Sequence, residues 1–327
     1  MQRQARSGGA DTQRLPGIID TFGEAFALLS GRVYLILVPI LLDLYLWLGA
    51  GLSVQSLTDT LARWLGRLPN ADQQALDTIV GLGQAYDLVD LLSIIVPTLV
   101  GQLGREALAP VGGGHWMVAL PWWAVPPVAV ALAAAGLAVG AVYLTAVAYL
   151  IRGQPLRNGG FWRVALRNAM RMLGFALVTV LGAIMLILPL GVLGVILLLM
   201  GVNAAPLMVL LGWLAAMWLF VLLFFAEYAI VMSDAGPLRA IYLSYNVVRH
   251  HLGGAVGFIV VYFVISSGVP VALRLLTGSP AGVVVAMAGN AFVATGVVAA
   301  AMLFYRDRAR TLGQPESSPG TAAGPAR

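Results

Sequence analysis

The chain has no cysteine and no lysine, and it carries few charges: 10% of its 327 residues are charged and 3 are histidine. Without cysteine there can be no disulfide, thiolate nucleophile or cysteine-ligated metal. Soluble proteins carry about 25% charged residues, so the low content argues against a water-soluble globule. The sequence also has no P-loop, zinc-protease, serine-hydrolase or dinucleotide-binding motif, which weakens an enzymatic assignment. We expect no metal and no cofactor.

Apolar residues are in excess instead, at 60% of the chain with a mean hydropathy of +0.90. The net charge of +5 and the pI near 9.8 come from arginines that lie beside apolar runs rather than in one patch. That distribution favours anionic lipid headgroups over nucleic acid as the partner. The composition predicts an all-α, multi-pass membrane protein, because hydrocarbon accepts a backbone only when its amides are bonded internally.

Six stretches are long and apolar enough to cross a bilayer, which takes about 20 residues. They are residues 33–52, 124–151, 172–199, 207–232, 254–273 and 281–305. We assign residues 18–310 to one membrane domain. The flanking segments 1–17 and 311–327 are expected to be disordered cytoplasmic tails, the second because it is rich in Gly, Pro, Ser and Ala.

The arginines predict the orientation of these spans. An even number of spans puts both termini on one side, together with the loop between the second and third spans. That side would then hold 15 of the 19 arginines. Cytoplasmic loops carry such an excess, so we predict cytoplasmic N- and C-termini in the cell membrane. Six of these arginines are candidate contacts for lipid headgroups: Arg152, Arg157, Arg163, Arg167, Arg171 and Arg249.

A seventh uncharged stretch, 91–104, has only 14 residues before Arg105 and is too short to span. Counting it would also move the arginine-rich loop to the outside. We expect it to be interfacial or re-entrant. It belongs to a long outer insert, 53–123, where apolar residues recur at helical spacing. The helices of this insert would lie on the membrane face or form a cap on the bundle; the sequence favours neither.

Short amphipathic helices are predicted before three pairs of spans, starting near Ile18, Trp162 and Pro237. Each would place apolar side chains on one face and polar or charged ones opposite. The spacing suggests three units of one amphipathic helix and one hairpin, the first carrying the outer insert. The expected fold is therefore a bundle of six transmembrane helices in three hairpins, each preceded by a cytoplasmic amphipathic helix.

Three polar residues within the expected spans form a candidate site: Asp43, Glu227 and Asn290. A carboxylate at the bilayer centre costs about 2.5–3.5 kcal/mol on insertion scales, so Asp43 needs a partner or a function. It is either a proton or cation site, or it makes an interhelical hydrogen bond. Asn290 lies at a similar depth and could be its partner, whereas Glu227 lies near a cytoplasmic end and could reach headgroup water.

The segment from Pro237 to Gly253, Pro-Leu-Arg-Ala-Ile-Tyr-Leu-Ser-Tyr-Asn-Val-Val-Arg-His-His-Leu-Gly, resembles uncharacterised bacterial multi-pass proteins. These are related to the membrane-anchoring domain of glycerophosphoryl diester phosphodiesterases. The resemblance covers about a quarter of the chain and implies a membrane anchor. It carries over no catalytic residue, because the chain has no room for a phosphodiesterase domain.

Two functions follow as hypotheses. The first is a non-catalytic bundle that anchors, assembles with or regulates partners at the cytoplasmic membrane, including other membrane proteins or a second copy. The alternative is a transporter or permease subunit that uses Asp43 together with Asn290 and Glu227. The alternative requires these three side chains to line one cavity.

Overall fold

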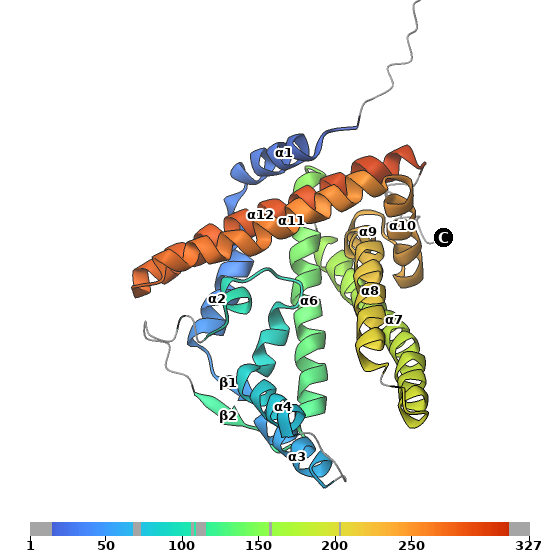
Figure 1. The fold of residues 1–327 in the computed structure, drawn as a ribbon. Coiled ribbons are helices and arrows are strands. Elements are labelled where there is room, and N and C mark those ends of the chain that lie inside the picture. Colours follow the sequence, from blue (N-terminus) through green and yellow to red (C-terminus); the bar gives the residue numbers. More distant parts are fainter. Residues whose placement is uncertain are drawn as a thin grey trace, which may run out of the picture.

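The computed structural model describes residues 15–67, 73–105, 108, 116–156, 159–202 and 204–313. In these residues the chain is almost entirely helical (Figure 1). The long helices are α6 (Val125–Ile151), α7 (Phe161–Leu199), α8 (Ala205–Leu223), α11 (Leu252–Leu273) and α12 (Pro280–Thr311). Shorter ones are α1 (Ile18–Ser30), α2 (Leu37–Leu48), α9 (Ala226–Met232) and α10 (Pro237–His250). The all-α prediction is confirmed.

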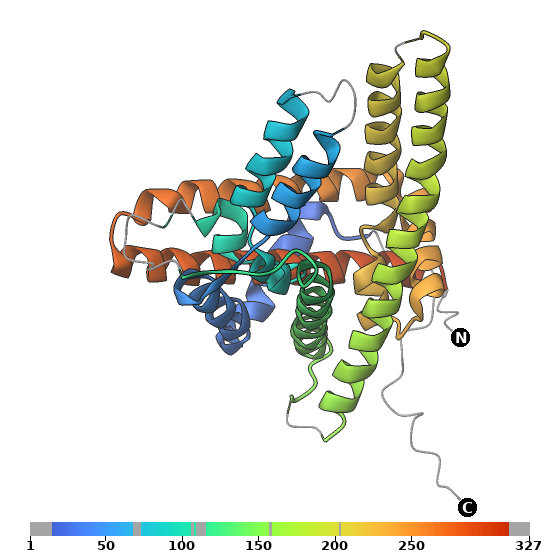
Figure 2. The same ribbon diagram turned by 90° about the horizontal axis from the view of Figure 1, so that it is seen from below.

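The core forms where α12 crosses α6 and packs along α11 and α1. Figures 1 and 2 show the paired helices α11 and α12 crossing α6 at a steep angle. Small residues allow the close contacts. A Cβ atom added to Gly296 of α12 would lie 2.2 Å from the Phe26 ring of α1. Residues 297–304 of α12 are all buried in this core.

The α7–α8 hairpin projects from this core (Figure 2). The first half of α7 packs against α6, and α10 packs near the base of the hairpin. Beyond the base, the most apolar windows of α7 and of the α8–α9 helix have no buried residue. Large side chains such as Met185, Leu188 and Trp213 are exposed there. The outer part of the hairpin is therefore exposed and does not belong to the core.

Five of the described helices are long and apolar enough to cross a membrane, or six if one bent pair counts as a single span. The bent pair is α1 with residues 33–48, which turn by 97°. The expected first span, 33–52, is shorter in the structure. A 3-10 turn η1 (Val33–Ile36) leads into the 12-residue α2, which ends before an extended Gly49. The chain is thus a multi-helix, membrane-type protein, with five or six candidate spans.

Two of the three expected amphipathic helices, α1 and α10, are separate helices. The second is not, because the stretch from Trp162 continues without a break into α7. The expected span 207–232 is instead divided at Phe224 and Phe225, between α8 and α9. Ser244 of α10 bridges this break: its hydroxyl donates to the Leu222 carbonyl and accepts from the Phe225 amide.

The insert 53–123 contains a helical hairpin and a small sheet. Helices α3 (Gln55–Leu65) and α4 (Gln73–Ala85) pack together. Strands β1 (Gly51–Ser53) and β2 (Met117–Ala119) pair in parallel, with Gly51 opposite Met117. The segment expected to be interfacial or re-entrant forms two short pieces, the 3-10 helix η2 (Leu88–Ser93) and α5 (Leu99–Leu103).

This broken segment packs into the core between α2 and α6. A Cβ atom on Gly136 would lie 2.2 Å from the Leu91 carbonyl oxygen, and one on Gly140 would lie 2.5 Å from Ile95. The two glycines thus allow η2 and the residues after it to approach α6 closely. As a result α2 packs on α12 and α5, while α6 packs on α7 and η2. The structure therefore does not pair the first two expected spans as a simple hairpin.

The expected disordered tails lie mostly outside the described residues, which exclude 1–14 and 314–327. Helix α12 continues to Thr311, six residues beyond the expected end of the last span at Tyr305.

Candidate functional site

Asp43 is buried and acts as a cap for α5. Its two carboxylate oxygens accept hydrogen bonds from the backbone amides of Leu99 at 2.9 Å and Val100 at 2.8 Å. These amides belong to the first turn of α5, where a helix has free N–H groups and a partial positive charge. The Thr98 hydroxyl accepts a hydrogen bond from the next backbone amide, that of Gly101, at 3.2 Å. This geometry matches the structural interpretation of Asp43, with backbone amides as the partners.

Asn290 is also buried, with 2% of its surface exposed, in the middle of α12. Its Nδ2 atom has no hydrogen-bond partner among the described residues. The Asp43 oxygens are instead bonded to α5, and no hydrogen bond joins the two side chains within the described structure. The two residues are therefore both buried but form no hydrogen-bonded pair.

Glu227 lies elsewhere. It is in the first turn of α9 and lines a cavity of about 560 Å³. The cavity walls come from α6, α7, α8, α9, α11 and α12 and from residues 94–95. Neither Asp43 nor Asn290 lines this cavity. The structure thus does not bring the three candidate residues together, and the alternative function lacks the common cavity that it requires.

The arginines divide into those that bind the protein and those that remain exposed. Arg152 donates to the carbonyls of Val231 at 3.1 Å and Met232 at 2.7 Å, which are free acceptors at the end of α9. Arg167 and Arg171, one turn apart on α7, both pair with Asp234 in the loop after α9. These three side chains hold the α9–α10 loop against α6 and α7.

Arg163 and Arg249 are exposed and remain open to lipid headgroups. The guanidinium of Arg249 lies 5.9 Å from the centre of the Tyr245 ring, one turn away on α10. Arg157, the remaining headgroup candidate, lies outside the described residues.

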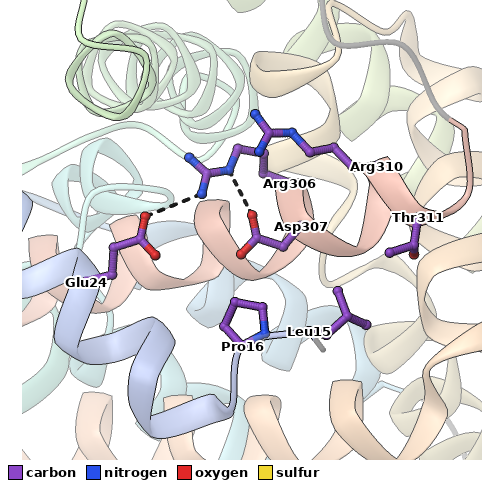
Figure 3. Close-up of a pocket in the computed structure, with 7 residues that line it drawn as sticks. All are labelled: Leu15, Pro16, Glu24, Arg306, Asp307, Arg310 and Thr311. Atoms are coloured by element: carbon purple, nitrogen blue, oxygen red, sulfur yellow. Dashed lines mark hydrogen bonds and ion pairs between the residues drawn. The ribbon is translucent and has the colours of Figure 1, made fainter. Parts of the chain in front are cut away.

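A second pocket, of about 480 Å³, lies where α1 meets the end of α12 (Figure 3). Arg306 joins the two helices by an ion pair with Glu24 at 3.4 Å, and it also contacts Asp307 at 2.9 Å. Sequence reasoning missed this site, because Glu24 and Arg306 are 282 residues apart and no motif marks either of them. The described residues contain no group of three or more potential metal-binding side chains.

Comparisons with protein-family models, with curated proteins and with solved structures give no match to this chain. The resemblance to the membrane-anchoring domain of phosphodiesterases therefore stays a prediction.

Proposed function

We propose that this chain is a non-catalytic integral membrane protein that assembles with other membrane proteins through the α7–α8 hairpin. The observation that carries the proposal is the surroundings of this hairpin. Its most apolar windows have no residue buried within the chain itself. The same helices expose large side chains such as Ile187, Leu210 and Trp213.

The glycines of the hairpin support a protein partner in addition to lipid. Lipid tails solvate apolar side chains, whereas association of helices within a membrane depends on close packing at small residues. Gly182, Gly191 and Gly212 have no neighbouring atom within 4 Å of an added Cβ. Small residues in open space permit the close approach of another helix. We take the partner to be apolar transmembrane helices of another protein.

The orientation is part of the proposal. The arginine bias favours cytoplasmic termini in the cell membrane. The α9–α10 loop and the exposed Arg163 and Arg249 would then lie at the inner leaflet, where anionic headgroups attract them. Asp43 binds the backbone amides of α5 and does not line the cavity that contains Glu227. This also favours an assembly protein over the transporter alternative, which requires a common cavity.

Photo-crosslinking from two tryptophan positions tests the proposal. Trp213 lies on the hairpin and Trp162 at the start of α7, and their side chains are similarly exposed, at 75% and 70%. A benzophenone amino acid at Trp213, activated in intact membranes, should give one protein adduct of defined mass. The same probe at Trp162 should not give it.

A matched pair of glycine variants makes this test specific. Gly212→Leu should abolish the adduct by filling the space that the partner helix would use. Gly23→Leu, on α1 and equally open, should leave it unchanged. Lipid adducts alone at Trp213 would contradict the proposal, as would an adduct of the chain with its own second copy only.

A further inference from the structure

The cavity at the base of the hairpin contains one charged group in an apolar wall. Its volume of about 560 Å³ lies within the range of small-molecule sites. Glu227 is the only charged residue among the described residues that line it. Most other lining residues are apolar, including Phe220 in the last turn of α8, Phe224 directly after α8, and Phe263 of α11.

The carboxyl group of Glu227 forms no ion pair with an Arg or His among the described residues. The neighbouring phenols of Tyr228 and Tyr262 carry no charge and line the same cavity. The Oγ1 atom of Thr179, which lines the same cavity, is buried without a hydrogen-bond partner among the described residues.

These groups define a ligand by complementarity. A carboxylate that leaves water requires a cation or a proton, and an unpartnered hydroxyl requires a hydrogen-bonding group. Aromatic faces attract ammonium groups and also pack against alkyl chains. A ligand with an ammonium head and an apolar tail satisfies all three features.

The route into the cavity is also apolar. Phe220 and Phe263 have ring centres 5.4 Å apart and are each 45% exposed, so they form the outer edge of the cavity. Both lie on helices that are long and apolar enough to cross a membrane. In the membrane protein that we propose, a ligand entering there would come from the bilayer rather than from water.

We propose that this cavity binds an amphiphile with a primary ammonium head, the ammonium against Glu227 and Thr179 and the tail along Phe220 and Phe263. A free long-chain amine and an aminophospholipid share this chemistry. The inference does not depend on the partner protein proposed for the hairpin.

Photolabelling of the purified full chain in phosphatidylcholine nanodiscs tests it. The probe is dodecylamine carrying a diazirine in its tail, and the labelled peptides are mapped by mass spectrometry. Label should concentrate on the peptides that contain Phe220 and Phe263. Unlabelled dodecylamine should compete at concentrations about tenfold lower than dodecanol, which has the same tail without the charge.

Two variants and one control decide the outcome. Glu227→Gln should weaken competition by dodecylamine about tenfold and leave dodecanol unchanged. Asp77→Asn, at an exposed carboxylate of α4 that does not line the cavity, should change neither. Ala216→Trp, at a cavity-lining position, should block both ligands by filling the space. Size-exclusion profiles establish that each variant is folded.

Equal dodecylamine affinity in Glu227→Gln and wild type would overturn the proposal. So would labelling that persists in Ala216→Trp or that maps outside the cavity. Competition by phosphatidylethanolamine would support the proposal with a membrane lipid as the ligand. Failure of phosphatidylethanolamine to compete, with dodecylamine still effective, would support it with a free amine.

Discussion

Helix α12 and the outer part of helix α7 are both strongly apolar, yet the first is the centre of the core and the second is exposed. Their most apolar windows have mean hydropathies of 2.0 and 2.8, and 67% and 0% of the residues in these windows are buried. The buried part of α12 is rich in Ala, Gly and Val, whereas the outer part of α7 is rich in Leu and Ile. Lipid is as apolar as leucine, so side-chain size rather than hydropathy separates protein-facing from outward-facing helices.

Polar groups differ in the same direction, with exceptions. In the core several are paired: the Tyr143 hydroxyl donates to Thr295 at 3.0 Å, and Asn168 donates to Thr145 at 3.0 Å. The exceptions include the Nδ2 atom of Asn290 and the Oδ1 atom of Asn168, which have no hydrogen-bond partner among the described residues. At the base of the hairpin, Thr179 and Glu227 face a cavity instead. The core therefore has the features of a structural element, and the hairpin and its cavity have those of a binding surface.

Asp43→Ala should cause the largest loss on the core side of this comparison. It leaves the buried amides of Leu99 and Val100 without acceptors, at about 1–3 kcal/mol each. We expect a marked fall in the thermal unfolding temperature in detergent. Asp77→Ala, at an exposed site on α4, is the control and should have almost no effect. Similar unfolding temperatures for the two variants would show that Asp43 is not a cap.

Gly296→Val should be the next most damaging change. The new side chain would collide with Phe26, and overpacking of this kind costs about 1–3 kcal/mol. Gly191→Val, on the outward part of α7, has no neighbour within 4 Å and should be tolerated in the isolated chain. Monodisperse yield and thermal unfolding of the two variants measure the difference. If Gly191→Val proved the more harmful, the contrast between the helices would be wrong.

The sequence predicted the helices better than their arrangement. Apolar length located the spans in α6, α7, α11 and α12, because this signal is local. The partners of Asp43 could not be predicted, because they are backbone amides of Leu99 and Val100 that no side chain marks. The packing of segment 91–95 against Gly136 and Gly140 could not be predicted either, since a glycine pair permits a close approach but does not specify its neighbour.

The breaks between helices were also hard to predict. The division between α8 and α9 depends on Ser244, some 20 residues away in the sequence, which satisfies the free backbone groups of Leu222 and Phe225. Conversely, the arginines at the start of α7 suggested a separate amphipathic helix, but no Gly or Pro interrupts the chain between Trp162 and Leu173. The helix continues because nothing there ends it.

Asp234→Asn should have a moderate effect at the junction between core and hairpin. It removes the charge that pairs with Arg167 and Arg171, and partly exposed ion pairs of this kind contribute about 1 kcal/mol or less. Asn tolerates the positive φ of 52° at this position, so the variant isolates the charge. The loss in unfolding temperature should shrink in high salt, because salt screens the pairs. A loss independent of salt would point to a different cause.

The smallest effect should be a pH dependence at His251, between α10 and α11. Burial, with Arg308 and His250 nearby, lowers the pKa of His251 below its usual 6.5. The folded state thus binds the proton less readily than the unfolded state, so stability should fall as the pH drops through that value. His251→Gln should reduce the difference in unfolding temperature between about pH 7.5 and pH 5.5. An unchanged difference in this variant would assign the effect to another group.

Labelling from within the bilayer tests the central contrast most directly. The purified chain in nanodiscs is exposed to a lipid-dissolved carbene precursor, and the modified residues are mapped by mass spectrometry. We predict label on the outer parts of α7 and α8, except where these two helices face each other, and none on residues 297–304 of α12. Absence of label from the outer part of α7, or equal labelling of α7 and α12, would contradict the account.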